Sequence, residues 1–147
     1  MLNLFIKPAH GAPMEARSVV SAIAGKGLSE DAAFGTSRRQ VLITDSETLA
    51  AFGLIPGAVR ENITLEGIRL EGLRRGSRLY IGDVALLVTG DCTPCDYIDG
   101  LRPGLRQSMA GKRGLLASVE RGGRLAVGSP VRLELPEAAI SHEAGAT

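Results

Sequence analysis

The stretch RLYIGDVALLVTG, residues 78–90, contains two short runs of β-forming residues separated by a glycine turn. Leu, Tyr, Ile and Val favour strands, and Gly82 supplies the turn between the two runs. Similar runs follow at short, regular spacing, again with glycines between them. They are NITLEG (62–67), GLLASVERG (114–122), RLAVG (124–128) and VRLEL (131–135). This pattern is typical of an all-β protein, and we expect a mostly antiparallel β-barrel with a few short flanking helices.

The other segments add strands at the start of the chain and two short helices. LNLFIKP (2–8) and RQVLIT (39–44) are rich in β-formers, whereas MEARSVVSAIAGKG (14–27) suits either a short helix or a strand. DSETLAAFGL (45–54) predicts a helix capped by Asp45 or Ser46, and a second short helix is expected within residues 103–110.

Two expectations concern how the strands connect. RGGR (121–124) is a candidate hairpin turn, because paired glycines adopt positive φ at little cost. RLAVG and VRLEL are expected to close the barrel, with the helix at Ser46–Phe52 lying outside it. Residues 1–135 are expected to form one domain and residues 136–147 a flexible tail.

Composition limits the classes of partner and the compartment. Hydrophobic residues make up 44% of the chain but aromatic residues only 3%, so the core must be aliphatic. The formal net charge of +1 gives no general reason to expect binding to nucleic acid or to an anionic membrane. No apolar run approaches the roughly 18–20 residues that span a bilayer. We therefore expect a cytoplasmic protein whose two cysteines rest as thiols.

Both cysteines lie in DCTPCD, residues 91–96, and four explanations compete. A structural zinc site needs four ligands, and the only histidines are His10 and His142 near opposite ends. A dithiol redox pair normally sits in a βαβ setting, which this sequence lacks. Two inert thiols would be unusual in such a turn. A single thiolate acting as a ligand or sulfur donor remains, with cations close downstream, which are Arg102, Arg106, Lys112 and Arg113.

Five segments, in order, resemble the MOSC domain, which is named for the C-terminal domain of molybdenum cofactor sulfurases. They are GKGLSED (25–31), RRQVLITDSETL (38–49), RENITLEGIRL (60–70), GSRLYIGDVALLVTGDCTPC (76–95) and GKRGLLASVERGGRLAVGSPVRL (111–133). Two departures stand out. The family's Gly-Asp is Glu30-Asp31 here, and its late Gly-Asp is Gly128-Ser129.

The resemblance implies a barrel of the pyruvate-kinase-barrel type and a role in molybdenum cofactor chemistry. The family cysteine carries sulfur as a persulfide or binds molybdenum, and its position corresponds to Cys95, which leaves Cys92 as a helper or bystander. The other residues placed at the cofactor by the resemblance are Asp31, Arg39, Asn62, Arg113 and Gly114. The two arginines are expected either at the phosphate or as surface charges, and Asn62 either at the pterin or in a structural role where the strand starts.

Three functions remain open from the sequence. The chain resembles a cofactor-binding protein or sulfur carrier, supplied by a separate pyridoxal-phosphate cysteine desulfurase because no pyridoxal phosphate is expected on this chain. Alternatively, it is a small molybdenum-dependent reductase of N-hydroxylated compounds with a separate redox partner protein. The third possibility is a C-x-x-C thiol module that uses no molybdenum.

Overall fold

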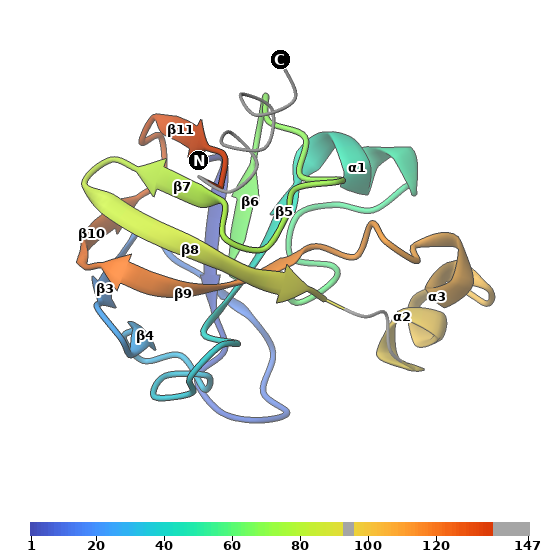
Figure 1. The fold of residues 1–147 in the computed structure, drawn as a ribbon. Coiled ribbons are helices and arrows are strands. Elements are labelled where there is room, and N and C mark those ends of the chain that lie inside the picture. Colours follow the sequence, from blue (N-terminus) through green and yellow to red (C-terminus); the bar gives the residue numbers. More distant parts are fainter. Residues whose placement is uncertain (93–95, 137–147) are drawn as a thin grey trace, which may run out of the picture.

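The computed structural model describes residues 1–92 and 96–136, which form two β-sheets and three short helices (Figure 1). The larger sheet has eight strands in the order β11-β7-β8-β9-β5-β6-β1-β2, and the smaller has the order β10-β3-β4. The strands are β1 (Asn3–Ile6), β2 (Glu15–Ala16), β3 (Val19–Ile23), β4 (Gly27–Leu28), β5 (Val41–Asp45), β6 (Ile63–Leu65), β7 (Arg78–Ile81), β8 (Val84–Asp91), β9 (Leu115–Arg121), β10 (Gly123–Ala126) and β11 (Val131–Glu134). The helices are α1 (Ser46–Ala51), α2 (Asp96–Leu101) and α3 (Leu105–Ser108).

The expectation of a mostly β protein with a few short helices is confirmed. All strand pairs in the described residues are antiparallel except β5 with β6, which run parallel. Closure into a barrel is not confirmed, because the two sheets do not join into one closed ladder. The runs expected to close the barrel lie in different sheets: β11 is at the edge of the larger sheet, and β10 is at the edge of the smaller one.

The hairpin predicted at RGGR is wrong. Residues 121–124 do join β9 to β10, but β10 pairs with β3, while β9 pairs with β8 and β5. A Cβ on Gly122 would lie 2.6 Å from the carbonyl oxygen of Ala22, so the chain passes directly against β3 there. The two glycines therefore form a corner at which the chain leaves one sheet for the other.

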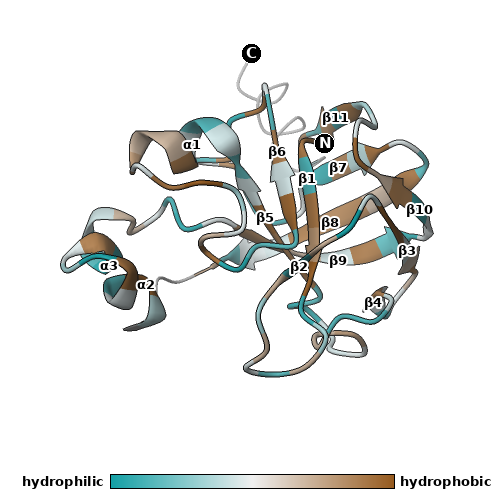
Figure 2. Cartoon of the chain, turned by 180° about the vertical axis from the view of Figure 1, so that it is seen from behind, coloured by the Kyte–Doolittle hydropathy of each residue, from teal (hydrophilic) through white to brown (hydrophobic). Residues whose placement is uncertain are grey.

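The core is aliphatic, as the composition predicts. β3 and β7 alternate exposed or half-buried with buried residues, which is the pattern of strands with one face on a core. Val20, Ala22 and Leu125 from the smaller sheet belong to the same buried cluster as Ile43 and Leu86 from the larger one. Figure 2 shows apolar residues concentrated along the strands of the larger sheet. The smaller sheet thus closes over the larger, and the two share one core.

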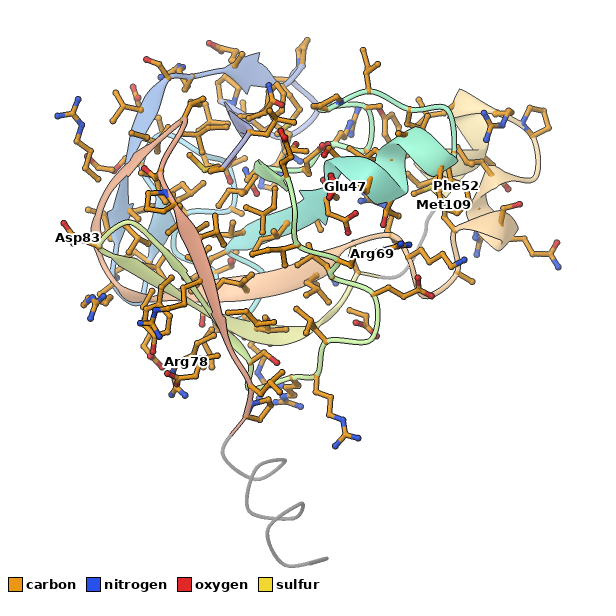
Figure 3. The ribbon with its side chains drawn as sticks, turned by 90° about the horizontal axis from the view of Figure 1, so that it is seen from above. Glu47, Phe52, Arg69, Arg78, Asp83 and Met109 are labelled. Atoms are coloured by element: carbon orange, nitrogen blue, oxygen red, sulfur yellow. The ribbon has the colours of Figure 1, made fainter. Side chains whose placement is uncertain are left out.

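A second, smaller cluster joins the helices. Leu49 of α1, Ile98 of α2 and Leu105 of α3 are buried together with Met109, and Phe52 packs against them (Figure 3). The predicted cap is confirmed, because Asp45 Oδ1 accepts a 2.7 Å hydrogen bond from the Thr48 amide. Helix α2 was not predicted, since DYIDGL has a glycine and, within residues 97–101, only Ile98 becomes fully buried. No helix in the described part of the chain is long and apolar enough to cross a membrane.

Candidate functional site

A cavity of about 250 Å³ lies where the ends of several strands of the larger sheet meet. Its lining comes from residues just after β1, β4 and β8 and at or before the starts of β5, β6 and β9. The lining residues are Lys7, Met14, Asp31, Ala33, Arg39, Leu42, Arg60, Asn62, Cys92, Arg113 and Leu116. We call this the cationic cavity, because four of its side chains are cations and one is a carboxylate.

Arg113 is the buried cation of this cavity. Only 5% of the residue is exposed, and Nη2 donates a 2.6 Å hydrogen bond to the Val59 carbonyl. Its Nε and Nη1 are buried and have no hydrogen-bond partner among the described residues. Buried polar groups without partners are rare in folded proteins, and a buried charge is costly unless it is paired. Arg113 therefore presents two strong donors that an anion in the cavity would satisfy.

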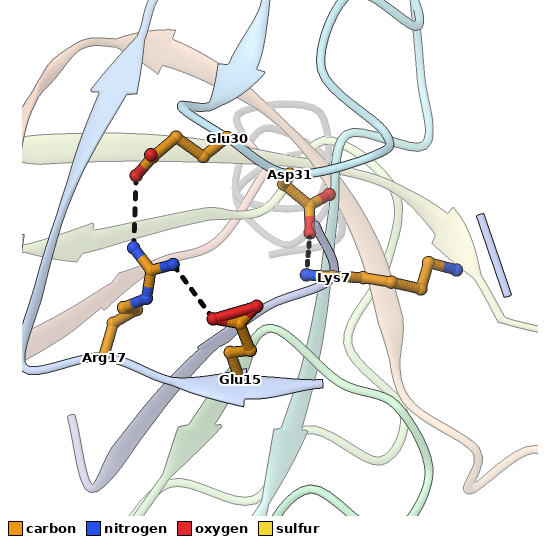
Figure 4. A network of polar contacts seen from close by, with 5 residues as sticks. All are labelled: Lys7, Glu15, Arg17, Glu30 and Asp31. Carbon is orange, nitrogen blue, oxygen red and sulfur yellow. Dashed lines mark hydrogen bonds and ion pairs between the residues drawn. The ribbon is translucent and has the colours of Figure 1, made fainter. Parts of the chain in front are cut away.

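Asn62 and Asp31 form a hydrogen-bond network in the wall. Asn62 Oδ1 accepts from the Leu42 amide at 2.9 Å, and its Nδ2 donates to the Phe5 carbonyl and to Asp31 Oδ1, at 3.2 and 3.1 Å. Asp31 also accepts from the Lys7 amide at 2.8 Å and from the Ala33 amide at 3.0 Å. Figure 4 shows Asp31 over the Lys7 backbone. The two side chains thus tie β1, β5 and the loop after β4 together.

The structure brings four of the six sequence-predicted site residues into this one lining, namely Asp31, Arg39, Asn62 and Arg113. Arg39 is exposed to solvent. Asn62 uses both of its amide hydrogens within the wall, so its side chain acts first as a structural link. A role of these residues in binding a cofactor stays a prediction.

Gly114 lines a different, much smaller cavity of about 20 Å³, together with Thr44 and Leu115. Its φ is +132°, and a Cβ there would lie 2.7 Å from the Ile43 carbonyl oxygen. The close approach of β5 therefore requires a glycine. Its carbonyl also accepts a 2.9 Å hydrogen bond from the Cys92 amide, which places Cys92 beside the Arg113–Gly114 segment.

The structure describes one of the two cysteines. Cys95 lies outside the described residues. Cys92 is 8% exposed and lines the cationic cavity, directly after β8. Within residues 1–92 and 96–136, no three His, Cys, Asp or Glu side chains are grouped so as to hold a metal ion.

The cations downstream of the cysteines do not all line the cationic cavity. Arg102 donates to the Phe52 carbonyl at 2.8 Å, and Lys112 lies 6.0 Å from the Phe52 ring centroid. These two side chains serve the helical cluster, and only Arg113 of the four appears in the cavity lining.

Sequence reasoning missed Lys7, Met14 and Arg60. Lys7 and Met14 come from the first fifteen residues, ahead of every segment that carried the resemblance. Arg60 precedes the Glu-Asn motif directly, but nothing in the sequence marks its φ of +62°, which is uncommon for a residue other than glycine. That conformation is the one signal that would have drawn attention to it, and it is visible only in the folded chain.

Glu30, which replaces a family glycine, has a φ of +69°. An L-residue in the left-handed region costs about 1–2 kcal/mol, whereas its exposed 3.1 Å ion pair with Arg17 is screened by solvent and stabilises the fold little. We expect Glu30→Gly to raise the free energy of unfolding by about 0.5–1 kcal/mol in urea denaturation, after allowance for the greater flexibility of glycine in the unfolded chain. Glu30→Ala loses the ion pair without relieving φ and should be less stable than wild type. Equal stabilities for the two variants would contradict this account.

Comparisons with known proteins agree with the fold and the motifs. The MOSC domain family model matches residues 9–132. Among solved structures, YuaD from Bacillus subtilis is similar with a TM-score of 0.77 and 22% identity, over 89% of this chain and 92% of that one. YiiM from Escherichia coli has a TM-score of 0.68 and 18% identity, over 91% and 70%. YiiM from Geobacillus stearothermophilus has a TM-score of 0.67 and 19% identity, over 96% and 80%. No curated protein matches the chain. The family model covers most of the chain, and the protein belongs to the MOSC domain family.

Proposed function

We propose that this protein binds the molybdenum cofactor in the cationic cavity and uses a cysteine thiolate there as a metal ligand or as a carrier of sulfur. The family is associated with molybdenum cofactor binding, which gives the proposal its chemical class. The observation that carries it is the buried Arg113 guanidinium, with two donors that have no partner among the described residues.

The residues of the cavity fit the polar parts of this cofactor. A phosphate offers several oxygens with negative charge, and a planar guanidinium binds such a group through two parallel hydrogen bonds. Arg113 would hold the phosphate inside the cavity, with Arg39 and Lys7 adding positive charge at the wall. The negative charge of Asp31 repels a bound phosphate only weakly, because its carboxylate already accepts hydrogen bonds from two backbone amides and Asn62.

The thiol completes the proposed site. Cys95 corresponds to the family cysteine, and Cys92 contributes a second sulfur to the lining. Soft thiolate ligands suit a metal that already has sulfur ligands, and an electropositive surrounding stabilises a thiolate. When bound, the cofactor supplies two-electron redox chemistry and a metal with affinity for sulfur.

The proposal is tested by the molybdenum, zinc and persulfide content of protein made in a cofactor-producing host. We expect bound molybdenum or persulfide in the wild type and in Cys92→Ser, and loss of both in Cys95→Ser, because a hydroxyl is a poor soft ligand and cannot carry sulfane sulfur. The same protein from a host that makes no cofactor is the matched control.

Other outcomes would point to the other functions. Equal losses of molybdenum and persulfide in both serine variants, with a disulfide forming on oxidation, would indicate a dithiol module in place of a single working thiolate. Stoichiometric zinc, with loss of folding in either variant, would indicate a structural metal site. Molybdenum in none of the proteins, together with no phosphate affinity, would remove the proposal.

A further inference from the structure

A second cavity lies beside the cationic one. It has a volume of about 470 Å³, and its lining residues are Phe5, Gly11, Pro13, Met14, Pro56, Gly57, Arg60 and Tyr97. We call it the aromatic cavity. Met14 and Arg60 line both cavities, so the two adjoin along these side chains. A single ligand can therefore have one part in each.

The two cavities differ in chemistry. Among the residues that the structure describes, Arg60 is the one charged residue in the lining of the aromatic cavity, which also contains two aromatic rings and a thioether. The far end of the Phe5 ring contacts Gly57, because a Cβ there would be 3.2–3.6 Å from Cζ, Cε1 and Cε2. The Tyr97 hydroxyl donates to the Ala58 carbonyl at 3.1 Å, which fixes the orientation of its ring. Both rings are thus held in place by the fold.

Arg60 stands at the boundary between the cavities. Its guanidinium carbon lies 4.1 Å from the centroid of the Tyr97 ring, within the range of a cation–π contact. Its left-handed φ is a strained conformation that persists only where the surroundings determine it. A guanidinium stacked in this way has a second planar face, on which a flat ring can stack, and its N–H groups remain able to meet an anion.

We propose that the aromatic cavity binds a planar aromatic ring whose anionic substituent lies in the cationic cavity. Rings stack favourably on other rings and on guanidinium groups, and a thioether sulfur also contacts ring edges favourably. The ring belongs either to the organic part of the cofactor or to a separate substrate. Only this choice of source rests on the proposed function.

The test compares 1-naphthyl phosphate with inorganic phosphate on the cofactor-free protein by calorimetry. We expect naphthyl phosphate to bind about tenfold more tightly, since ring stacking adds to the phosphate contact. Tyr97→Leu should remove this gain and leave the affinity for inorganic phosphate unchanged, and Tyr97→Phe should keep the gain. Thermal unfolding of both variants shows whether the helical cluster is intact.

Methionine methyl signals locate the ring. The chain has three methionines, and in protein labelled at these methyls, naphthyl phosphate should shift Met14 upfield while the buried Met109 stays unchanged. Inorganic phosphate should give no such ring-current shift.

The two sources of the ring are separated with cofactor-loaded protein and 1-naphthol, which has no phosphate. If 1-naphthol shifts the Met14 signal in the cofactor-free protein but not in the cofactor-loaded protein, the cofactor occupies the aromatic cavity. If the shift is the same in both proteins, the cavity is free for a substrate. The inference is overturned if naphthyl phosphate binds no more tightly than inorganic phosphate, or if the gain survives Tyr97→Leu. Failure of the proposed function is a different result, namely no molybdenum and no affinity for inorganic phosphate.

Discussion

Arg113→Met is expected to weaken the binding of phosphate by at least about 30-fold while leaving the unliganded protein as stable as wild type or more stable. Hydrogen bonds to charged groups contribute about 1.5–3 kcal/mol each, and the variant loses both the charge and the two donors that have no partner among the described residues. Removing one hydrogen bond to Val59 costs stability, but the variant no longer buries a charge that has no ion-pair partner among the described residues. Calorimetry with inorganic phosphate and urea denaturation measure the two effects.

Two matched variants separate charge from geometry. Arg113→Lys keeps the charge but lacks the planar fork, so its affinity for phosphate should fall between those of the wild type and Arg113→Met. Arg39→Met removes an exposed cation and should lower the affinity less than fivefold, since exposed charges are screened by solvent and salt. An Arg113→Met protein that binds phosphate within threefold of wild type would exclude Arg113 as the anion ligand.

Glu61→Ala is expected to lower the free energy of unfolding by about 3 kcal/mol or more. Glu61 is fully buried, and its Oε2 accepts hydrogen bonds from the Thr44 and Thr64 hydroxyls and from the Gly57 amide, at 3.1, 2.8 and 2.9 Å. Truncation leaves three donors without an acceptor and opens a void, and each unsatisfied buried group costs about 1–3 kcal/mol. The midpoint and slope of urea denaturation measure the loss.

Glu61→Gln is the matched control. It keeps an oxygen for the three donors but places an amide where Oε1 has no partner among the described residues, so we expect a cost of about 1–2 kcal/mol. Because the Gly57 amide starts the loop that carries Val59 and Arg60, Glu61→Ala should also weaken phosphate binding. A stability loss below 1 kcal/mol in the alanine variant would show that the donors find other partners.

Local sequence signals predicted the strands and helices well where the structure of a segment depends only on its own residues. Strands β7 and β8 follow from two runs of β-forming residues on either side of Gly82, and the cap of α1 follows from an acidic residue before a helical run. The RGGR hairpin was predicted wrongly for the same local reason. Paired glycines indicate a sharp change of direction, but the choice of pairing partner depends on β3, about a hundred residues away.

The cavity could be predicted only in part. The family resemblance identified Asp31, Arg39, Asn62 and Arg113, which the fold places in one lining. It did not identify Arg60 or Lys7, because their place depends on the paths of separate loops past the ends of β1 and β6. The structural reason for a glycine at position 114 could not be predicted either, since it depends on how closely β5 approaches the backbone of Gly114.

The hydrogen bond from the Cys92 amide to the Gly114 carbonyl continues the pairing of β8 with β9. The spacing between Cys92 and Arg113 is therefore fixed by strand register, and the twenty residues that connect them in the chain do not set it. Such a connection tolerates insertions and deletions, since loop length has little effect on a site that its flanking strands already hold. The α2–α3 segment is thus a place where this fold can acquire a different docking surface over evolutionary time while the wall of the cationic cavity stays the same.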